Sequence, residues 1–202
     1  MRVEFLGTGT STGVPMIGCR CDVCRSKDSR DRRLRSSVCL TVDDKNILID
    51  CGPDFRQQML RSGIDHIDAV LLTHEHYDHT SGLDELRNFS RNNPIPIYAE
   101  PNVLDIIHQR LFYCFSKQPN PGVAHLELKA IENLSPFTLF GIDIEPVRVW
   151  HYRLPIIGYR IGRFAYITDM LTIPDGECAK LSNLDTLVVN ALRHKPHISH
   201  QN

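Results

Sequence analysis

The sequence predicts an α/β protein organised around one buried strand that ends in a cluster of metal-binding residue types. The apolar run Val70-Leu71-Leu72 breaks abruptly into Thr73-His74-Glu75-His76-Tyr77-Asp78-His79. Around it, segments with the two-residue alternation of strands are interspersed with segments that carry the apolar stripe of helices. At this length, a single domain over residues 1–202 is expected.

The composition is that of an ordinary globular protein. Of the 202 residues, 42% are hydrophobic and 23% are charged, which is enough for a sizeable core. No apolar stretch approaches membrane length and residues 1–6 have the pattern of a strand, so a cytoplasmic protein without a membrane partner is expected. The formal charge of −1 argues against a protein that binds long nucleic acid over its whole surface.

The elements before the central motif are mainly strands. Residues 2–6 alternate as a strand and lead into the glycine-rich segment 7–13. Its spacing fits neither common phosphate-binding loop, so a tight turn is favoured, with a phosphate cradle as the alternative. Short strands are predicted at 38–42 and 46–50, followed by a helix at 54–62.

Helices and strands continue after the motif. Helices are predicted at 81–89, 101–112 and 174–181, and strands at 95–98, 137–150 and 185–189, the last of them buried. Residues 158–161 and 164–167 are predicted to pair as a hairpin.

The central motif has the spacing of a metal site. His74 and His76 are two residues apart in extended chain, so both project to the same side and can bind one cation. Asp78 and His79 follow where the chain is expected to turn into a helix, and can bind a second cation. A histidine-rich solvated loop is the alternative, but it leaves three imidazoles and a carboxylate after an apolar strand unexplained.

A second cluster consists of Cys19, Cys21 and Cys24. Three thiols within six residues approach the spacing of a zinc knuckle, and the total of seven cysteines is odd. We therefore expect thiolate ligation of a structural zinc in a reducing compartment. A fourth ligand is not evident nearby, and three free cysteines in a loop are the alternative.

A basic segment follows the cysteines. Residues 20–35 contain six arginines and one lysine against three aspartates. Guanidinium groups match phosphate geometry, so this segment is interpreted either as a binding surface for a phosphorylated substrate or as a solvated loop.

The HxHxDH motif of residues 74–79 resembles the signature of the metallo-β-lactamase superfamily. This resemblance implies a four-layer α/β/β/α sandwich with one or two divalent metals. The glycine-rich entrance, the cysteine cluster and the arginines after it further resemble the cyclic phosphate phosphodiesterases of the carbon–phosphorus lyase pathway. That family departs from this chain at the end, where a further strand and helix normally follow. We therefore expect the domain to lack its C-terminal strand and helix, and the second metal site and the cysteine site each to be one ligand short.

The resemblance also implies roles for residues outside the motif. His151 ends a predicted strand where the superfamily supplies its next ligand, and Asp169 matches the carboxylate that bridges the two metals. Asp50 matches a carboxylate that orients neighbouring loops. His200 matches a histidine that meets the substrate phosphate, with His194 and His197 as alternatives. The implied metal ligands are His74, His76 and His151 for the first ion, Asp78 and His79 for the second, and Asp169 between them.

These assignments predict a phosphoric diester hydrolase. Two Zn²⁺ or Mn²⁺ ions are expected to activate a bridging hydroxide against a small or cyclic phosphodiester, with Asp78 and His200 as catalytic residues. The alternatives are an endonuclease that processes tRNA 3′ ends and a non-catalytic metal-binding relative. The sequence leaves open whether a homodimer forms.

Overall fold

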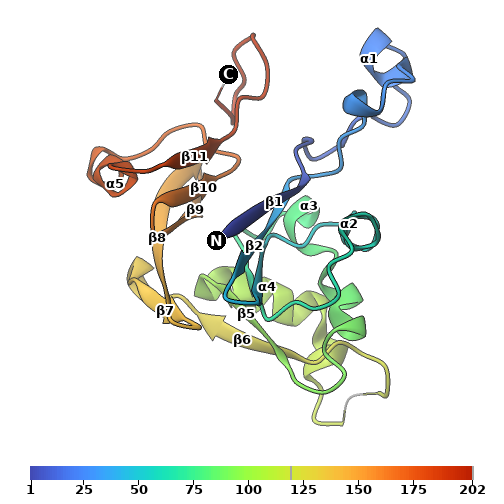
Figure 1. The fold of residues 1–202 in the computed structure, drawn as a ribbon, viewed down its shortest axis with the longest axis vertical. Helices are drawn as coiled ribbons and strands as arrows, with labels where there is room; N and C mark the ends of the chain where they lie inside the picture. The colour runs from blue at the N-terminus through green and yellow to red at the C-terminus, as the bar shows by residue number, and fades with distance from the viewer. Residues whose placement is uncertain (119, 202) are drawn as a thin grey trace. The chain divides into compact units, whose positions relative to one another are not determined.

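The structure is a computed structural model that describes residues 1–118 and 120–201. It divides into two compact units, Met1–Ala130 and Ile131–Asn202. Each unit contains one β-sheet, and Figure 1 shows the elements of both. None of the helices in the described residues has both the length and the apolar character needed to cross a membrane.

The first unit is built on a six-stranded sheet. Its strands lie in chain order, β1 (Arg2–Gly7), β2 (Ser37–Val42), β3 (Lys45–Ile49), β4 (Ala69–Leu71), β5 (Ile95–Ala99) and β6 (Leu126–Ala130). The pairs β1–β2 and β2–β3 are antiparallel, whereas β3 to β6 run parallel. The carboxyl ends of β3 and β4 therefore meet at one edge of the sheet, which is where ligands commonly bind in parallel sheets.

Helices cover the sheet of the first unit with apolar residues. They are α2 (Phe55–Ser62) and α4 (Pro101–Arg110), with the short α1 (Asp22–Arg25) and α3 (Tyr77–Thr80) in loops. Phe55 and Met59 of α2 and Ile107 of α4 belong to the same buried core as Val70 of β4 and Ile97 of β5. The 3₁₀ helices of this unit are η1 (Ser29–Asp31), η2 (Leu83–Asn88) and η3 (Phe112–Phe115).

The second unit is built on a five-stranded sheet in the order β11-β10-β9-β8-β7. The strands are β7 (Phe137–Leu139), β8 (Ile142–His151), β9 (Leu154–Ile161), β10 (Phe164–Ile167) and β11 (Thr186–Val189), with η4 (Glu132–Leu134), α5 (Asp175–Cys178) and η5 (Ala179–Leu181) outside the sheet. A small core of Val147, Val149, Ile156 and Ile167 determines which face of β8, β9 and β10 is buried. The register of β8 on β9 ends at the pair His151 and Leu154, so these strands are joined by a two-residue turn.

Two sequence predictions need correction in their element type. Residues 81–89 were expected to be an α-helix, but Leu83–Asn88 is 3₁₀. The backbone N–H of Gly82 donates to the carbonyl of Cys51, 2.8 Å away, and so does not continue the helical ladder of α3. The strand predicted over 137–150 is a hairpin of β7 and β8, because Phe140 (φ 53°) and Gly141 (φ 78°) adopt the left-handed conformation of a tight turn.

Two further differences concern the sheets. Residues 185–189 were expected to form a buried strand, but β11 lies at the edge of its sheet, and Leu187 and Val189 are 46% and 43% exposed. No sequence signal predicted β6, which extends the first sheet beyond β5. The remaining predicted helices and strands are confirmed to within a few residues at their ends.

Candidate metal centre

The loop after β4 brings four of the predicted ligands together within the first unit. His74 and His79 are buried, whereas His76 is exposed. The ring centroid of His74 lies 4.6 Å from that of His76 and 4.2 Å from that of His79. Nε2 of His79 lies 3.3 Å from Oδ2 of Asp78. The motif thus folds into one compact group of three imidazoles and a carboxylate.

Asp50, at the end of β3, holds this group in place. Its carboxylate accepts hydrogen bonds from the backbone N–H of Thr73 (2.8 Å), the Thr73 hydroxyl (2.9 Å) and Nδ1 of His79 (2.7 Å). Asp50 is fully buried, and burial raises the pKa of its carboxyl, while the neighbouring His79 and the hydrogen bonds from Thr73 act against that rise. The orienting role expected for Asp50 agrees with these contacts.

The same hydrogen bonds decide which imidazole nitrogen carries the proton. A carboxylate only accepts, so His79 is protonated on Nδ1, and in the neutral ring the lone pair is on Nε2. The Thr73 hydroxyl donates to Asp50 and therefore accepts from Nδ1 of His74, 2.9 Å away. His74 thus also carries its lone pair on Nε2. Both rings are held in the tautomer that metal ligation requires.

The distances within the group fit a divalent metal. Two atoms bound at about 2.0–2.1 Å to one tetrahedral zinc lie roughly 3.3 Å apart. This is the separation of Nε2 of His79 and Oδ2 of Asp78. Neutral imidazoles and a carboxylate are also the donor types that zinc and similar ions select. The residues of the first unit therefore fit the metal that the motif predicts.

Glycine is needed where the segments around the motif approach one another. A Cβ at Gly52 would lie 2.0 Å from the carbonyl oxygen of Asp78, and a Cβ at Gly82 would lie 2.2 Å from that of Gly52. Backbone hydrogen bonds from Cys51 to His79 and from Gly82 to Cys51, both 2.8 Å, close the same contact. The Asp50-Cys51-Gly52 sequence thus supplies an orienting carboxylate and the space beside it.

The second unit brings together the other predicted site residues. Nδ1 of His151 lies 2.9 Å from the carbonyl oxygen of Asp169 and 3.0 Å from that of Ser199, so it donates and the lone pair of His151 is on Nε2. Nδ1 of His200 lies 3.2 Å from Oδ1 of Asp169. The ring of His200 lies 4.6 Å from that of His151 and 4.9 Å from that of His197, measured between centroids. Three imidazoles and one carboxylate thus form a second compact group.

The backbone at Asp169 is held in an unusual conformation. Its φ is 53°, a left-handed value that costs free energy in a residue other than glycine. The next residue, Met170, is fixed by Asn190, whose Oδ1 accepts from the Met170 N–H at 2.8 Å and whose Nδ2 donates to the Met170 carbonyl at 3.0 Å. The backbone N–H of Gln201 also donates to that carbonyl, at 2.7 Å. These contacts tie the segment with His200 to the loop with Asp169. Of the two alternatives to His200, His197 lies in this group, and His194 is an exposed residue.

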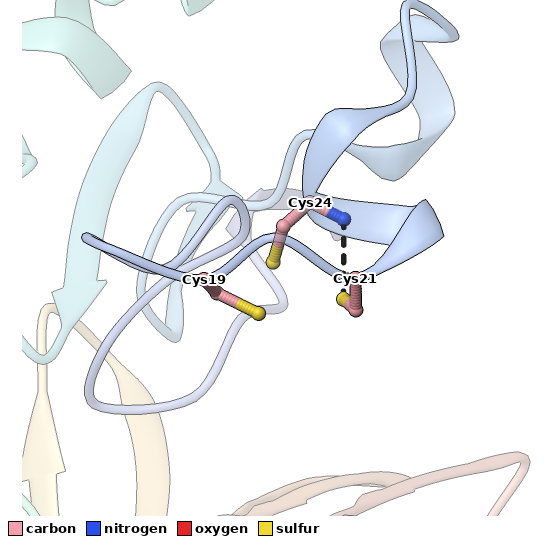
Figure 2. A group of neighbouring side chains, drawn as sticks. All are labelled: Cys19, Cys21 and Cys24. Atoms are coloured by element: carbon pink, nitrogen blue, oxygen red, sulfur yellow. Dashed lines mark hydrogen bonds between the residues drawn. The ribbon is translucent and has the colours of Figure 1, made fainter.

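The three clustered cysteines converge as expected for a metal site. Figure 2 shows the thiols of Cys19, Cys21 and Cys24 pointing toward one another, and their Sγ atoms all lie within 4.8 Å of one another. The backbone N–H of Cys24 donates to Sγ of Cys21 at 3.5 Å, which lowers the pKa of that thiol. The backbone N–H of Met16 donates to Sγ of Cys24 at 3.4 Å. In the part of the chain that the structure describes, no histidine, further cysteine or acidic residue joins these three thiols as a fourth ligand.

The glycine-rich segment packs as a tight turn against the basic segment. A Cβ at Gly7 would lie 1.9 Å from the carbonyl oxygen of Arg35, so the two backbones are in contact. Arg35 forms an ion pair with Asp54 at 2.8 Å and donates to the Ser11 carbonyl at 2.9 Å, and it therefore has a structural role. Arg30 is paired with Asp28 at 2.6 Å. Arg33 donates to the hydroxyl of Thr8 at 3.2 Å. For the other cations of residues 20–35, both interpretations of the basic segment stay open.

Sequence reasoning missed the contribution of Thr73. It lies between the apolar strand and the first histidine and relays the hydrogen bond from His74 to Asp50. The signal available in the sequence was a threonine next to a predicted ligand. Its partner Asp50 lies 23 residues earlier in the chain, and the pairing depends on the register of β3 with β4.

Comparison with known proteins identifies the class to which this fold and these residues belong. A family model described as "Beta-lactamase superfamily domain" matches residues 45–202, and the chain therefore belongs to the beta-lactamase superfamily. A crystal structure described as a new diphosphatase from the PhnP family superposes with a TM-score of 0.90 and 43% sequence identity, covering 98% of this chain and 76% of that one. The chain thus has the metallo-β-lactamase fold and resembles a member of the PhnP family. The predicted α/β sandwich class is confirmed.

Other relatives carry different names. A protein of Porphyromonas gingivalis named octanoyltransferase is 51% identical over 203 residues, which cover 100% of this chain but only 41% of that protein. Zn²⁺-bound PqqB from Methylobacterium extorquens has a TM-score of 0.75 at 25% identity, with 94% of this chain and 72% of that chain covered. The short form of human tRNase Z has a TM-score of 0.67 at 22% identity, with 92% and 76% covered, and this likeness shows the fold alone.

Proposed function

We propose that the protein is a metal-dependent phosphodiesterase that acts on small or cyclic phosphodiesters. The observation that carries this proposal is the hydrogen-bond network of Asp50, which fixes His74 and His79 in the tautomer of metal ligands. The resemblance to a PhnP-family diphosphatase supports phosphoric ester hydrolysis as the chemistry.

The proposed centre contains two divalent ions, Zn²⁺ or Mn²⁺. His74, His76 and His151 are assigned to one ion, Asp78 and His79 to the other, and Asp169 is shared. When bound, such ions lower the pKa of water toward neutrality and neutralise phosphoryl oxygens.

The protein's own residues would then control proton transfer. His200 faces Asp169 through Nδ1, and its protonated ring is proposed to donate from Nε2 to a phosphoryl oxygen or to the leaving group. Such a contribution is typically worth about 10²-fold or more in rate. Asp78 is placed beside Nε2 of His79 and is proposed to share the proton transfer.

The cysteine cluster is proposed to hold a structural zinc. Its three thiols are separate from the catalytic assignment and resemble a closed thiolate site. All seven cysteines are free, in agreement with the proposed cytoplasmic location.

Metal analysis coupled to hydrolysis tests the proposal. We expect the wild-type chain to retain divalent metal after dialysis and to hydrolyse bis(p-nitrophenyl) phosphate. His79→Ala should lose hydrolysis and active-site metal while the thiol-bound zinc stays, because His79 is buried at the proposed site. His66→Ala is the matched control, since His66 bonds to Asp65 on the surface and contacts no predicted ligand. Full metal-dependent hydrolysis by His79→Ala would refute the assignment.

Two alternatives are separated by direct assays. Specific 3′ cleavage of precursor tRNA, with weak hydrolysis of small phosphodiesters, would favour the endonuclease. Retained zinc at the thiols without a second metal or turnover would favour a non-catalytic relative. The octanoyltransferase name does not add a third candidate, since most of that relative lies outside the match.

A further inference from the structure

The turn between β8 and β9 carries two side chains that the proposed reaction does not use. Tyr152 and Arg153 are the only residues between the paired His151 and Leu154. The guanidinium carbon of Arg153 lies 5.2 Å from the centroid of the Tyr152 ring, which is a cation–π contact. Tyr152 is 49% exposed and Arg153 is also exposed. The turn therefore presents an aromatic ring and a delocalised cation together at the surface.

The backbone of this turn has an unfavourable φ at Tyr152. Tyr152 has a φ of 56°, in the left-handed region that glycine and asparagine adopt far more readily than tyrosine. The favoured two-residue hairpin turns have a positive φ at their first central residue, so the turn itself accounts for this conformation. It holds Tyr152 at the hairpin tip with its ring half exposed.

The position of the turn relates it to the proposed chemistry. Tyr152 directly follows His151, so their Cα atoms are about 3.8 Å apart. His151 belongs to the same group as Asp169 and His200. The turn therefore directly follows, along the chain, the group whose His200 is proposed to meet the phosphate.

We propose that Tyr152 and Arg153 form a nucleobase platform, which makes the substrate a nucleotide-containing phosphodiester. This inference rests on the proposed function and specifies its substrate class. An exposed aromatic face stacks with the planar face of any base, and the adjacent guanidinium adds cation–π attraction. A sugar phosphate without a base gains neither interaction. Recognition of a base by stacking is tolerant of base identity, because every base has a planar face.

Two other aromatic residues serve the experiment, Trp150 as a fluorescence reporter of binding and Phe140 as a control position. Trp150 is the only tryptophan in the sequence and lies two residues before Tyr152, with 37% of its surface exposed. Phe140 is also an aromatic residue with a left-handed φ, of 53°, at a hairpin tip, and it is 45% exposed. It precedes β8, whereas Tyr152 follows that strand, so the two tips are about 30 Å apart along an extended strand of this length.

Binding measurements test the platform without requiring turnover. Adenosine 5′-monophosphate and ribose 5-phosphate differ by the base alone, and each is titrated into the full chain while Trp150 fluorescence is followed, with equilibrium dialysis as a second readout. We expect the adenosine compound to bind about tenfold more tightly. Tyr152→Asn, which suits the left-handed backbone, should remove that preference and leave ribose 5-phosphate binding unchanged, whereas Phe140→Asn should change neither.

The outcomes separate this inference from the proposed function. Equal binding of the two compounds, no binding of the adenosine compound by dialysis, or an unchanged preference in Tyr152→Asn would overturn the platform. Hydrolysis of bis(p-nitrophenyl) phosphate together with such a result would leave the phosphodiesterase proposal in place. A base preference that depends on Tyr152 supports the platform, and it does so even in protein that shows no hydrolysis.

Discussion

Replacing Asp50 by asparagine tests the reasoning about the metal centre most directly. The substitution keeps the side-chain shape but replaces one acceptor oxygen by an NH₂ group that only donates. The retained oxygen is expected to accept from the Thr73 N–H and hydroxyl, which now hold Oδ1 at 2.8 and 3.1 Å. The NH₂ group then faces Nδ1 of His79, in place of Oδ2 at 2.7 Å. His79 is thereby driven to accept on Nδ1 and to carry its proton on Nε2.

The magnitude follows from the role of that nitrogen. With its proton on Nε2, His79 has no lone pair directed at the metal, so binding must first reverse the tautomer and break a hydrogen bond. Loss of a group that orients a metal ligand typically lowers metal affinity or activity by about 10–100-fold, which corresponds to about 1.4–2.7 kcal/mol. Folding stability should fall less than it would on removal of one partner of a buried charge pair. The neutral amide leaves no negative charge to bury, and burial already disfavours that charge by raising the pKa of the Asp50 carboxyl.

The assay combines metal affinity with a spectroscopic readout. Competition with a chelator of known affinity gives the change in metal binding, and ¹⁵N NMR of the histidine rings reports the tautomer of His79. Asp68→Asn is the matched control, since Asp68 accepts from Lys45 and from the Asn46 backbone and contacts no predicted ligand. Wild-type metal affinity in Asp50→Asn, or a His79 ring that keeps its proton on Nδ1, would refute the reasoning.

Two further predictions concern packing and pH. Gly52→Ala should lower the free energy of unfolding by about 1–3 kcal/mol and weaken metal binding, because its Cβ would lie 2.0 Å from the Asp78 carbonyl oxygen; urea unfolding should show no comparable loss for Gly176→Ala, where no atom lies within 4 Å of the added Cβ. The hydrogen bond to Asp65 raises the pKa of His66 above 6.5, so its stabilisation is full below that pH and is lost as pH rises through the folded pKa. The His66 side chain is 52% exposed, so its contribution to the free energy of unfolding should stay within about 0.5 kcal/mol. His66→Ala should reduce the difference in the free energy of unfolding between acidic and alkaline buffer. An unchanged difference would contradict this role of His66.

The element predictions succeeded where the signal is local. The strand before His74 and the helix stopped by Gly63 follow from neighbouring residues, and both are present. The β7–β8 hairpin was missed because its turn, Phe140-Gly141, has an aromatic residue where asparagine or aspartate is the usual signal. Residues 83–88 became a 3₁₀ helix because Gly82 bonds to Cys51, far earlier in the chain, and a pattern within the segment does not report such a partner.

The sequence by itself determined which chemical groups are available at the site. The spacing of His74, His76, Asp78 and His79 and the three thiols of Cys19, Cys21 and Cys24 indicate metal ligation, because side-chain direction over a few residues follows from local backbone geometry.

Only the tertiary structure decided how those groups are prepared. Asp50 reaches His79 because Ile49 of β3 lies in register with Leu71 of β4, and that parallel pairing sets the tautomer of the imidazole. The Tyr152–Arg153 turn likewise exists only because β8 pairs with β9 up to His151. Protonation and presentation of a side chain depend on partners distant in the chain, and the fold selects those partners.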